Sequence, residues 1–175
     1  MHPRIPLSLA ALLFLLSAGP QFAKQPETAA SERINPGPGM PAPAWQLTDI
    51  NGQTVQLSDF KGNVVILDFW ATWYPQSNAE ISALVALQKK EKDKGLVVVG
   101  VAVDDGGPDA ISAFMKSHLG INYPIVIGDD IVRLRYGGIT SLPTTFVIGR
   151  DGIIASVHQG PIGKDTFKKE LKKLL

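Results

Sequence analysis

Two carboxylic acids and two hydroxyl-bearing residues lie close together where an apolar strand gives way to a helix. Asp68 stands within the apolar run 64–70, and Tyr74, Ser77 and Glu80 follow around the start of the predicted helix. Carboxyl groups can exchange protons, and a serine hydroxyl can act as a nucleophile when a base lies beside it. Sites in open α/β sheets gather at the carboxyl ends of strands, where helix N-termini supply free N–H donors. The sequence therefore predicts a functional site here.

The chain of 175 residues contains no cysteine, which excludes structural disulfides, thiol chemistry and thiolate metal sites. Its three histidines, at positions 2, 118 and 158, lack the spacing of metal ligands, so we expect no metal and no other cofactor. A serine nucleophile needs a positioned base. His118 lies on the apolar stripe of a predicted helix, His158 ends a predicted strand, and no G-x-S-x-G surrounds Ser77. We therefore do not expect hydrolase chemistry.

Composition points to one ordinary globular domain with additional sequence in front of it. Hydrophobic residues make up 45% of the chain, and 17 basic residues balance 16 acidic ones to a net charge of +1. This balance gives no electrostatic reason to expect nucleic acid as a partner. No Lys/Arg-rich run indicates contact with an anionic membrane surface either.

The N-terminal part reads as an export signal followed by a tether. Arg4 precedes an apolar segment at 5–19, which is shorter than the roughly 20 residues that span a bilayer. We therefore expect residues 1–23 to be a secretory signal, or a membrane anchor if it stays uncut, and the protein to be periplasmic or otherwise extracytoplasmic. Residues 24–43, rich in Pro and Gly, are expected to form a linker, and residues 44–175 the folded domain.

Strands and helices that alternate along the chain must position the candidate site. A hairpin is predicted around Asn51-Gly52, because both residues accept a positive φ, and a second one around Gly149–Gly152. The other elements follow from apolar periodicity and from flanking Gly and Pro residues. These are strands over 64–70, 96–103 and 123–127, helices over 75–92 and from 108, a short helix that ends near 136, and a last helix carrying Phe167, Leu171 and Leu174.

Three motifs resemble the TlpA/ResA type of thioredoxin-like proteins, which are related to the AhpC/TSA redoxins. Residues 64–77 follow the pattern V-V-x-x-x-F-W-A-T-W-C-x-x-C except at the two cysteines, and residues 141–146 follow G-x-P-T-T-F with Ser for Gly. Residues 42–62 look like the N-terminal hairpin of this group. The resemblance covers 42–175. It implies an α/β, thioredoxin-like fold with a central mixed sheet flanked by helices and an extra N-terminal β-hairpin, an order of elements that the prediction above matches.

In that family the two cysteines perform thiol–disulfide exchange through a mixed disulfide. Here Tyr74 and Ser77 stand at the cysteine positions, and neither a phenol nor a serine hydroxyl can form that intermediate. We therefore expect a redox-inactive protein that binds a protein or peptide. Two alternatives stay open. One is a family-level role as a thiol-disulfide oxidoreductase or antioxidant redoxin, of the envelope disulfide-reduction or cytochrome c maturation type. The other is a structural subunit that docks through its folded surface.

The resemblance also implies where a peptide binds. In the family, the proline of the TTF motif is cis and faces the cysteine pair, and the backbone of the residue before it pairs with an extended substrate segment. Such strand pairing needs no sulfur. We therefore expect a peptide-binding site, with Trp70 in the same aromatic patch, at Trp73, Tyr74, Leu142, Pro143 and Thr144. Tyr74 could equally act as a plug that fills the space of the smaller cysteine.

The two acids have alternative explanations. Asp68 matches the buried acid of thioredoxins, which exchanges a proton with the second cysteine. It could instead be held by a lysine, a hydroxyl or water, and its pKa should be raised if no cation pairs with it. Glu80 matches an acid that the TlpA/ResA group carries after the second cysteine. It could also simply complement the dipole of its helix.

Overall fold

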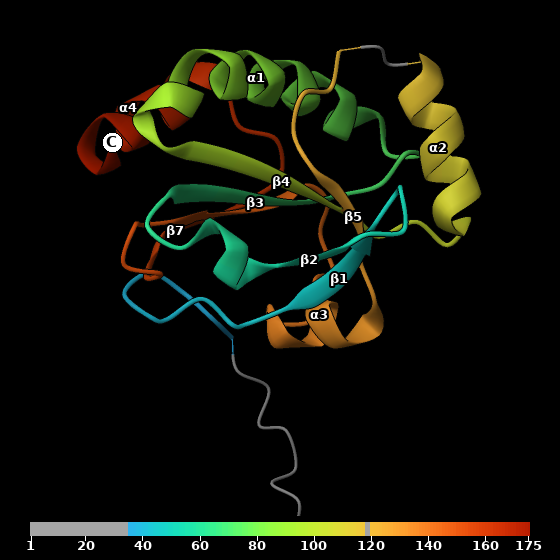
Figure 1. The fold of residues 1–175 in the computed structure, drawn as a ribbon, viewed down its shortest axis with the longest axis horizontal. Helices are drawn as coiled ribbons and strands as arrows, with labels where there is room; N and C mark the ends of the chain where they lie inside the picture. Colours follow the sequence, from blue (N-terminus) through green and yellow to red (C-terminus); the bar gives the residue numbers. More distant parts are fainter. Residues whose placement is uncertain (1–34, 118–119) are drawn as a thin grey trace, which may run out of the picture. The chain divides into compact units, whose positions relative to one another are not determined.

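The computed structural model of the protein describes residues 35–117 and 120–175. The predicted signal at 1–23, the first part of the predicted linker and His118 lie outside the described residues. Within them, one seven-stranded sheet has the order β2-β1-β5-β4-β3-β6-β7 (Figure 1). The strands are β1 (Gln46–Asp49), β2 (Thr54–Gln56), β3 (Val64–Trp70), β4 (Leu96–Ala102), β5 (Ile125–Ile127), β6 (Thr144–Ile148) and β7 (Ile154–Gln159). The helices are α1 (Pro75–Glu91), α2 (Gly107–Ser117), α3 (Asp130–Arg135) and α4 (Lys164–Leu174), with 3₁₀ turns η1 (Leu57–Phe60) and η2 (Lys92–Lys94).

The central strand β3 pairs in parallel with β4 and antiparallel with β6, so the sheet is mixed. Figure 1 shows α1 and α4 on one face of the sheet and α3 on the other. Because helices cover both faces, every residue of β3 is buried. Ile66 and Trp70 belong to the apolar cluster that includes α1 and α4, and Leu67 and Phe69 to the cluster on the α3 side. Asp68 shares the α1 face, because side chains alternate along a strand.

The N-terminal hairpin forms as predicted and extends the sheet. Strands β1 and β2 pair antiparallel, and Gly52 has the positive φ of 81° that its turn requires. Strand β1 also pairs antiparallel with β5, as Thr48 lies opposite Ile127. The second hairpin, β6–β7, forms where it was expected.

Helix α1 begins with Pro75 at its first position, which suits a residue that lacks an N–H. Its buried side includes Ile81, Leu84 and Leu87. The Gln88 side chain on the same helix hydrogen-bonds strand β4, accepting from Val98 N at 2.7 Å. None of the helices in the described part of the chain is long and apolar enough to cross a membrane.

Residues 35–43, expected to be part of the linker, lie against the β6–β7 hairpin. Gly39 N donates to Ile154 O at 2.8 Å, Ile154 N donates to Met40 O at 2.9 Å, and Ala42 N donates to Gly152 O at 2.9 Å. Pro41 forms an isolated antiparallel bridge with Ile153. These backbone hydrogen bonds order the segment although it buries little apolar surface. The ordered chain therefore begins before residue 44, and composition alone did not predict this.

Candidate functional site

The predicted site lies where β3 ends and α1 begins. Trp73 and Tyr74 occupy the connection, with ring centroids 5.8 Å apart in an edge-to-face arrangement. Tyr74 is half-buried, whereas Trp73 is 62% exposed. Because Trp73 and Tyr74 also line one hollow of the surface, this connection is a candidate contact surface.

A groove of about 450 Å³ runs beside these two rings. It is lined by Trp73, Tyr74, Val103, Asp105, Arg133, Ile139, Thr140, Ser141 and Leu142. The structure thus brings together three of the predicted binding residues, Trp73, Tyr74 and Leu142. We call this hollow the groove.

The other two predicted binding residues lie behind the groove. The Leu142–Pro143 peptide bond is cis, Pro143 is buried, and its carbonyl accepts a hydrogen bond from Gly160 N at 2.8 Å. Thr144 is 3% exposed and donates from its hydroxyl to Ser141 O at 2.7 Å. Pro143 and Thr144 therefore support the loop that carries Leu142, and neither lines the groove.

Asp104 fixes the connection that carries the two aromatic rings. Its carboxylate accepts from Thr72 N at 3.0 and 3.1 Å and also from the Thr72 hydroxyl. Tyr74 N donates to Ala71 O at 3.2 Å within the same turn. The backbone before α1 is thereby tied to the end of β4, which positions Trp73 and Tyr74.

Trp70 is not part of this surface. Its side chain is 1% exposed and packs against Phe114 of α2, with ring centroids 5.1 Å apart. A Cβ at Gly100 of the neighbouring strand would come within 2.9 Å of Trp70 Nε1, so the absence of a side chain there makes room for the indole. Trp70 thus contributes to the core, and the aromatic patch consists of Trp73 and Tyr74.

A buried polar cluster lies under the start of α1. Thr145, which stands opposite Asp68 in the β3–β6 ladder, places its hydroxyl oxygen 3.1 Å from Asp68 Oδ1 and 3.1 Å from Glu80 Oε1. Asp68 is 1% exposed and Glu80 2% exposed. In the described part of the chain no lysine or arginine forms an ion pair with either acid. The two carboxyls therefore share one hydroxyl in place of a counter-ion.

A hydroxyl carries a single hydrogen, so Thr145 can donate to only one of the two acids at a time. The other contact is a hydrogen bond only if the second acid is protonated and donates to the Thr145 oxygen. Burial raises the pKa of Asp68 to about 7, as predicted. Burial, and then the charge of Asp68, raises the pKa of Glu80 to about 8. Glu80 is therefore not a surface charge that complements the helix dipole.

The neighbours of this cluster add no reactive group. Tyr123 is 8% exposed, and burial, with the nearby acids Asp68 and Glu80, raises the pKa of its phenol far above the ordinary value. Ser77 is 1% exposed, and its hydroxyl has no hydrogen-bond partner among the described residues. No base therefore contacts Ser77 within that part of the structure. His158 instead lies 3.0 Å from Glu170 of α4.

Sequence reasoning missed several residues that line the groove. Asp105 and Val103 follow the end of β4, and the rule that sites gather at the carboxyl ends of strands could have found them. Arg133 comes from α3 and Ile139 from the loop after it. No motif marks these two, because only the tertiary fold brings α3 next to the β3–α1 connection.

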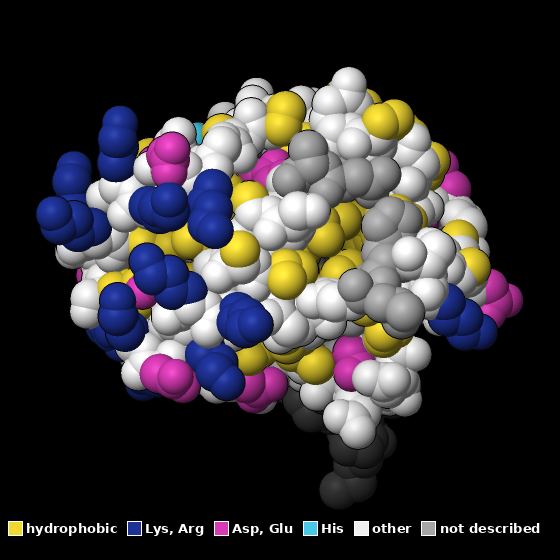
Figure 2. All heavy atoms as spheres, turned by 90° about the horizontal axis from the view of Figure 1, so that it is seen from above, with side chains coloured by type: hydrophobic (Ala, Val, Ile, Leu, Met, Phe, Trp, Pro, Cys, Tyr) yellow, Lys and Arg dark blue, Asp and Glu magenta, His cyan; other side chains and the backbone are white. Residues whose placement is uncertain are grey.

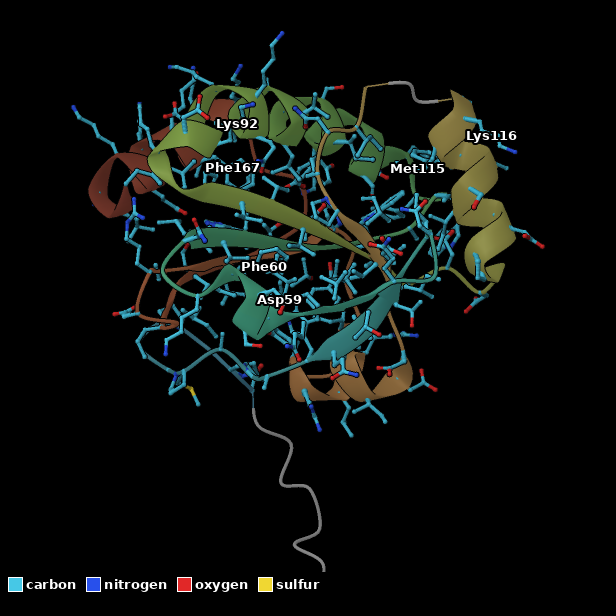
Figure 3. All side chains as sticks on the ribbon, viewed as in Figure 1. Asp59, Phe60, Lys92, Met115, Lys116 and Phe167 are labelled. Carbon is cyan, nitrogen blue, oxygen red and sulfur yellow. The ribbon has the colours of Figure 1, made fainter. Side chains whose placement is uncertain are left out.

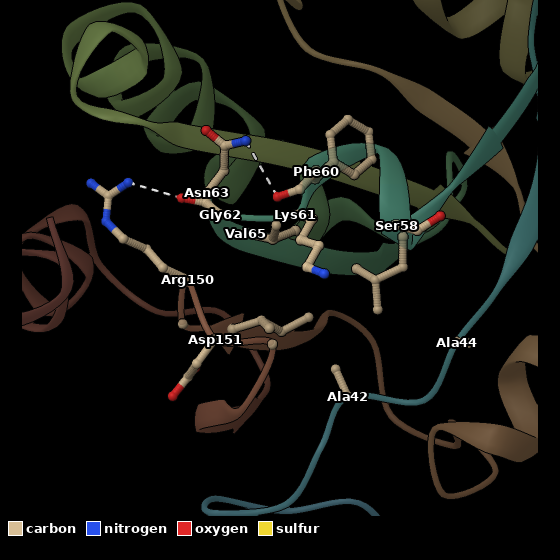
Figure 4. A pocket seen from close by; sticks show the side chains of 14 residues that line it. Ala42, Ala44, Ser58, Phe60, Lys61, Gly62, Asn63, Val65, Arg150 and Asp151 are labelled. Atoms are coloured by element: carbon tan, nitrogen blue, oxygen red, sulfur yellow. Dashed lines mark hydrogen bonds between the residues drawn. The ribbon is translucent and has the colours of Figure 1, made fainter.

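A second hollow, of about 340 Å³, lies away from the groove (Figure 4). Val65 and Ile148, which pair at the beginning of β3, are among its lining residues, whereas Tyr74 follows the end of that strand. Arg150 at its rim donates to Gly62 O at 3.0 Å and to Lys94 O at 2.6 Å. This guanidinium thus connects loops of the fold, and the hollow is separate from the predicted site.

Solved structures place this architecture in a known class. A thiol:disulfide interchange protein of the thioredoxin family from Chlorobium tepidum matches 81% of this chain and 99% of its own, with 31% identity and a TM-score of 0.71. A thiol:disulfide interchange protein from a Bacteroides species shares the fold, with a TM-score of 0.70 over 81% of this chain and 92% of its own at 24% identity. The fold and the position of the site define a thioredoxin-like protein, which confirms the predicted fold class.

The particular family follows from the sequence comparisons. Residues 38–157 match the AhpC/TSA family. The thiol-disulfide oxidoreductase ResA of Bacillus subtilis is 37% identical over 122 residues, covering 70% of this chain and 67% of its own. ResA of Bacillus thuringiensis is 32% identical over 138 residues and 78% of each chain. This chain therefore belongs to the AhpC/TSA family, and its predicted resemblance to ResA is confirmed.

Proposed function

We propose that this protein is an exported, redox-inactive member of its family that binds a protein or an extended peptide segment in the groove. The observation that carries the proposal is the combination of an intact groove with Tyr74 and Ser77 at the positions of the two cysteines. The surface that could hold a polypeptide is present, whereas the sulfur atoms that could exchange electrons with it are absent.

The backbone of Leu142 supports this mode of binding. Among the described residues, neither its N–H nor its C=O makes a hydrogen bond, and Leu142 is only half-buried. Backbone groups without a partner in the fold can pair with an added strand, and neighbouring pockets then select its side chains. The exposed ring of Trp73 and the half-buried ring of Tyr74 flank this backbone and supply apolar contact area.

Export is supported by the sequence of residues 1–23 and by one relative. The thioredoxin Etrx1 of Streptococcus pneumoniae, described as an exposed lipoprotein, matches 75% of this chain and all of its own chain at 27% identity, with a TM-score of 0.66. This chain has no cysteine to carry a lipid. An export signal, either removed or kept as an anchor, accounts for the apolar segment at 5–19.

Photo-crosslinking in the producing cell tests the groove. A photoreactive phenylalanine analogue replaces Trp73, which tolerates substitution because it is 62% exposed. We expect a discrete protein adduct that disappears when Leu142→Arg is added, because a cation then stands in the apolar part of the groove. Tyr74→Ala should change the adduct yield if Tyr74 contacts the partner. If Tyr74 is a plug, the same change should alter only the free energy of unfolding.

The matched control places the same analogue at Lys116, an exposed position on α2 that is not part of the groove. An adduct that forms equally from position 116, or that survives Leu142→Arg, would support the alternative of a structural subunit that docks elsewhere. Thermal unfolding of each variant verifies that lost crosslinking reflects lost contact and not lost folding.

A further inference from the structure

Lysines gather at the end of the domain where α1 stops and α4 lies beside it. Figure 2 shows the basic side chains concentrated over this end. We call this surface the lysine face, and it comprises Lys89, Lys90, Lys92, Lys94, Lys164, Lys168, Lys169, Lys172 and Lys173. The same segments contain the acidic residues Glu91, Asp93, Asp165 and Glu170. A protein with a net charge of only +1 thus concentrates its positive charge on one face.

The acids of this face form ion pairs with only three of its nine lysines in the described part of the chain. Glu91 Oε2 lies 2.7 Å from Lys94 Nζ, Glu91 Oε1 lies 3.5 Å from Lys90 Nζ, and Asp165 Oδ1 lies 2.8 Å from Lys168 Nζ. Glu170 turns toward β7, where it accepts from the Ser156 hydroxyl at 2.7 Å. Within the described residues, Lys89, Lys92, Lys172 and Lys173 form no ion pair. Their ammonium groups are therefore available to an external anion.

Helix stabilisation does not account for the whole cluster. Lysines in the last turns of α1 and α4 complement the helix dipoles. Lys164 and Lys168, however, lie in the first half of α4, and Lys164 is its first residue, where a positive charge opposes the dipole. The apolar side of α4 is already used, since Phe167 is fully buried against the sheet (Figure 3). The lysines therefore lie on the side of α4 that faces away from the sheet.

The chemistry of the face favours a diffuse anionic surface over a protein. All nine cations of these segments are lysines, whose ammonium groups stay hydrated and need no fixed geometry. Arg150 lies beside Lys94, but its guanidinium already donates to Lys94 O and Gly62 O within the fold. Protein interfaces are depleted of lysine and enriched in arginine and aromatic residues. The exposed large apolar residues of the described chain, Met40, Trp73, Ile131 and Leu134, all lie outside the segments of this face. Stacking platforms for nucleic-acid bases are therefore missing here.

We infer that the lysine face binds the anionic headgroups of a phospholipid bilayer. Lysines near an anionic leaflet each add to the attraction, which salt weakens. A hollow of about 310 Å³ between α1 and α4 is lined in part by Lys90, Lys94, Lys168 and Lys172, so four of these lysines surround one depression of the face.

This surface and the groove lie at the two ends of α1. Trp73 and Tyr74 immediately precede the helix, and Lys89 and Lys90 lie in its last turn. At 1.5 Å per residue, a helix of 17 residues separates them by about 25 Å. A domain bound through its lysines therefore holds the groove away from the bilayer, where a partner can reach it. The inference does not depend on what the groove binds.

Vesicle sedimentation with the full chain tests this inference. The probes are phosphatidylcholine vesicles with and without about 30% phosphatidylglycerol, in about 0.05 M and about 0.5 M salt. We expect at least about tenfold more bound protein on the anionic vesicles at low salt, and loss of this difference at high salt. The double variant Lys92→Glu/Lys172→Glu should abolish the difference. Its matched control, Lys116→Glu/Arg135→Glu, makes the same charge change at exposed positions of α2 and α3 and should keep the difference.

Several outcomes overturn the inference. Equal binding to both kinds of vesicle would assign any membrane contact to the apolar N-terminal segment. If both double variants lose the preference for anionic vesicles equally, vesicle binding depends on the net charge of the protein and not on the lysine face. Binding to poly-glutamate but not to anionic vesicles would assign the face to an acidic protein partner. Thermal unfolding of both double variants, and the milder pair Lys92→Gln/Lys172→Gln, separates a loss of binding from a loss of folding.

Discussion

At the scale of single residues, the central feature is a pair of buried acids that share one hydroxyl. Asp68 and Glu80 are both nearly inaccessible, and Thr145 lies within 3.1 Å of each. The resemblance to ResA implies that such acids stand beside a thiol, whereas this chain contains no cysteine. The two acids are therefore buried without a thiol to exchange protons with.

This arrangement predicts a pH-dependent stability. Burial raises the pKa of Asp68 to about 7 and that of Glu80 to about 8, whereas unfolded Asp and Glu titrate near 4. Above about pH 4 the folded state holds protons that the unfolded state has released. Stability is therefore full below that pH and is lost as pH rises through the two folded-state values. We expect the free energy of unfolding to fall by several kcal/mol, about 6 from the two groups together, between pH 5 and pH 8 in denaturant titrations.

The variant Asp68→Asn is the control for this dependence. It keeps an acceptor for the Thr145 hydroxyl, removes one of the two titrating groups and should flatten the pH profile, whereas Asp109→Asn, on the exposed side of α2, should leave it unchanged. A free energy of unfolding in the original protein that rises or stays level from pH 5 to pH 8 would show that the two acids are not held protonated.

At the scale of elements, the sequence predicted most of the fold because its signals are local. Asn51-Gly52 marks one hairpin turn, and the apolar run 96–103 marks a strand buried on both faces. Residues 35–43 were missed because their order comes from backbone hydrogen bonds to distant Ile154 and Gly152, which composition does not encode.

A side-chain contact between α1 and β4 could not be predicted from the periodic spacing of apolar residues. Strand β5 pairs with β4 only from Gly100 onward, so Val98 has no strand partner on that side. The Gln88 side chain takes the place of the missing strand, because it accepts from Val98 N at 2.7 Å and donates to Leu96 O at 3.4 Å. A pattern of apolar residues cannot predict such a polar contact on the inner side of a helix.

Removing this contact should destabilise the domain. In Gln88→Ala, the buried Val98 N–H loses its acceptor, and we expect the free energy of unfolding to fall by about 1–3 kcal/mol. The control is Gln76→Ala at the exposed start of α1, which should change it by less than about 0.5 kcal/mol. If Gln88→Ala and Gln76→Ala lower the free energy of unfolding equally in urea, the change in helix propensity would explain both, and the hydrogen bond to Val98 would contribute nothing measurable.

At the scale of the whole molecule, the groove is assembled from three separate parts of the chain. The motif resemblance predicted Trp73, Tyr74 and Leu142, which the structure brings together. Arg133 and Ile139 were not predicted, since only the packing of α3 and its following loop brings them to the groove. The lysine face was missed for the same reason, because two lysine-bearing segments about 70 residues apart in sequence meet only in the fold.

We propose that this protein has the fold and the groove of a thiol-disulfide oxidoreductase but lacks the two cysteines that would carry the redox chemistry. The most direct measurement is the reduction of insulin disulfides, with dithiothreitol as electron donor, by the purified full chain and by the double variant Tyr74→Cys/Ser77→Cys. We predict that the original protein stays at the rate of the reductant alone and that the variant exceeds it by about tenfold or more. Turnover by the cysteine-free protein would contradict its proposed redox inactivity.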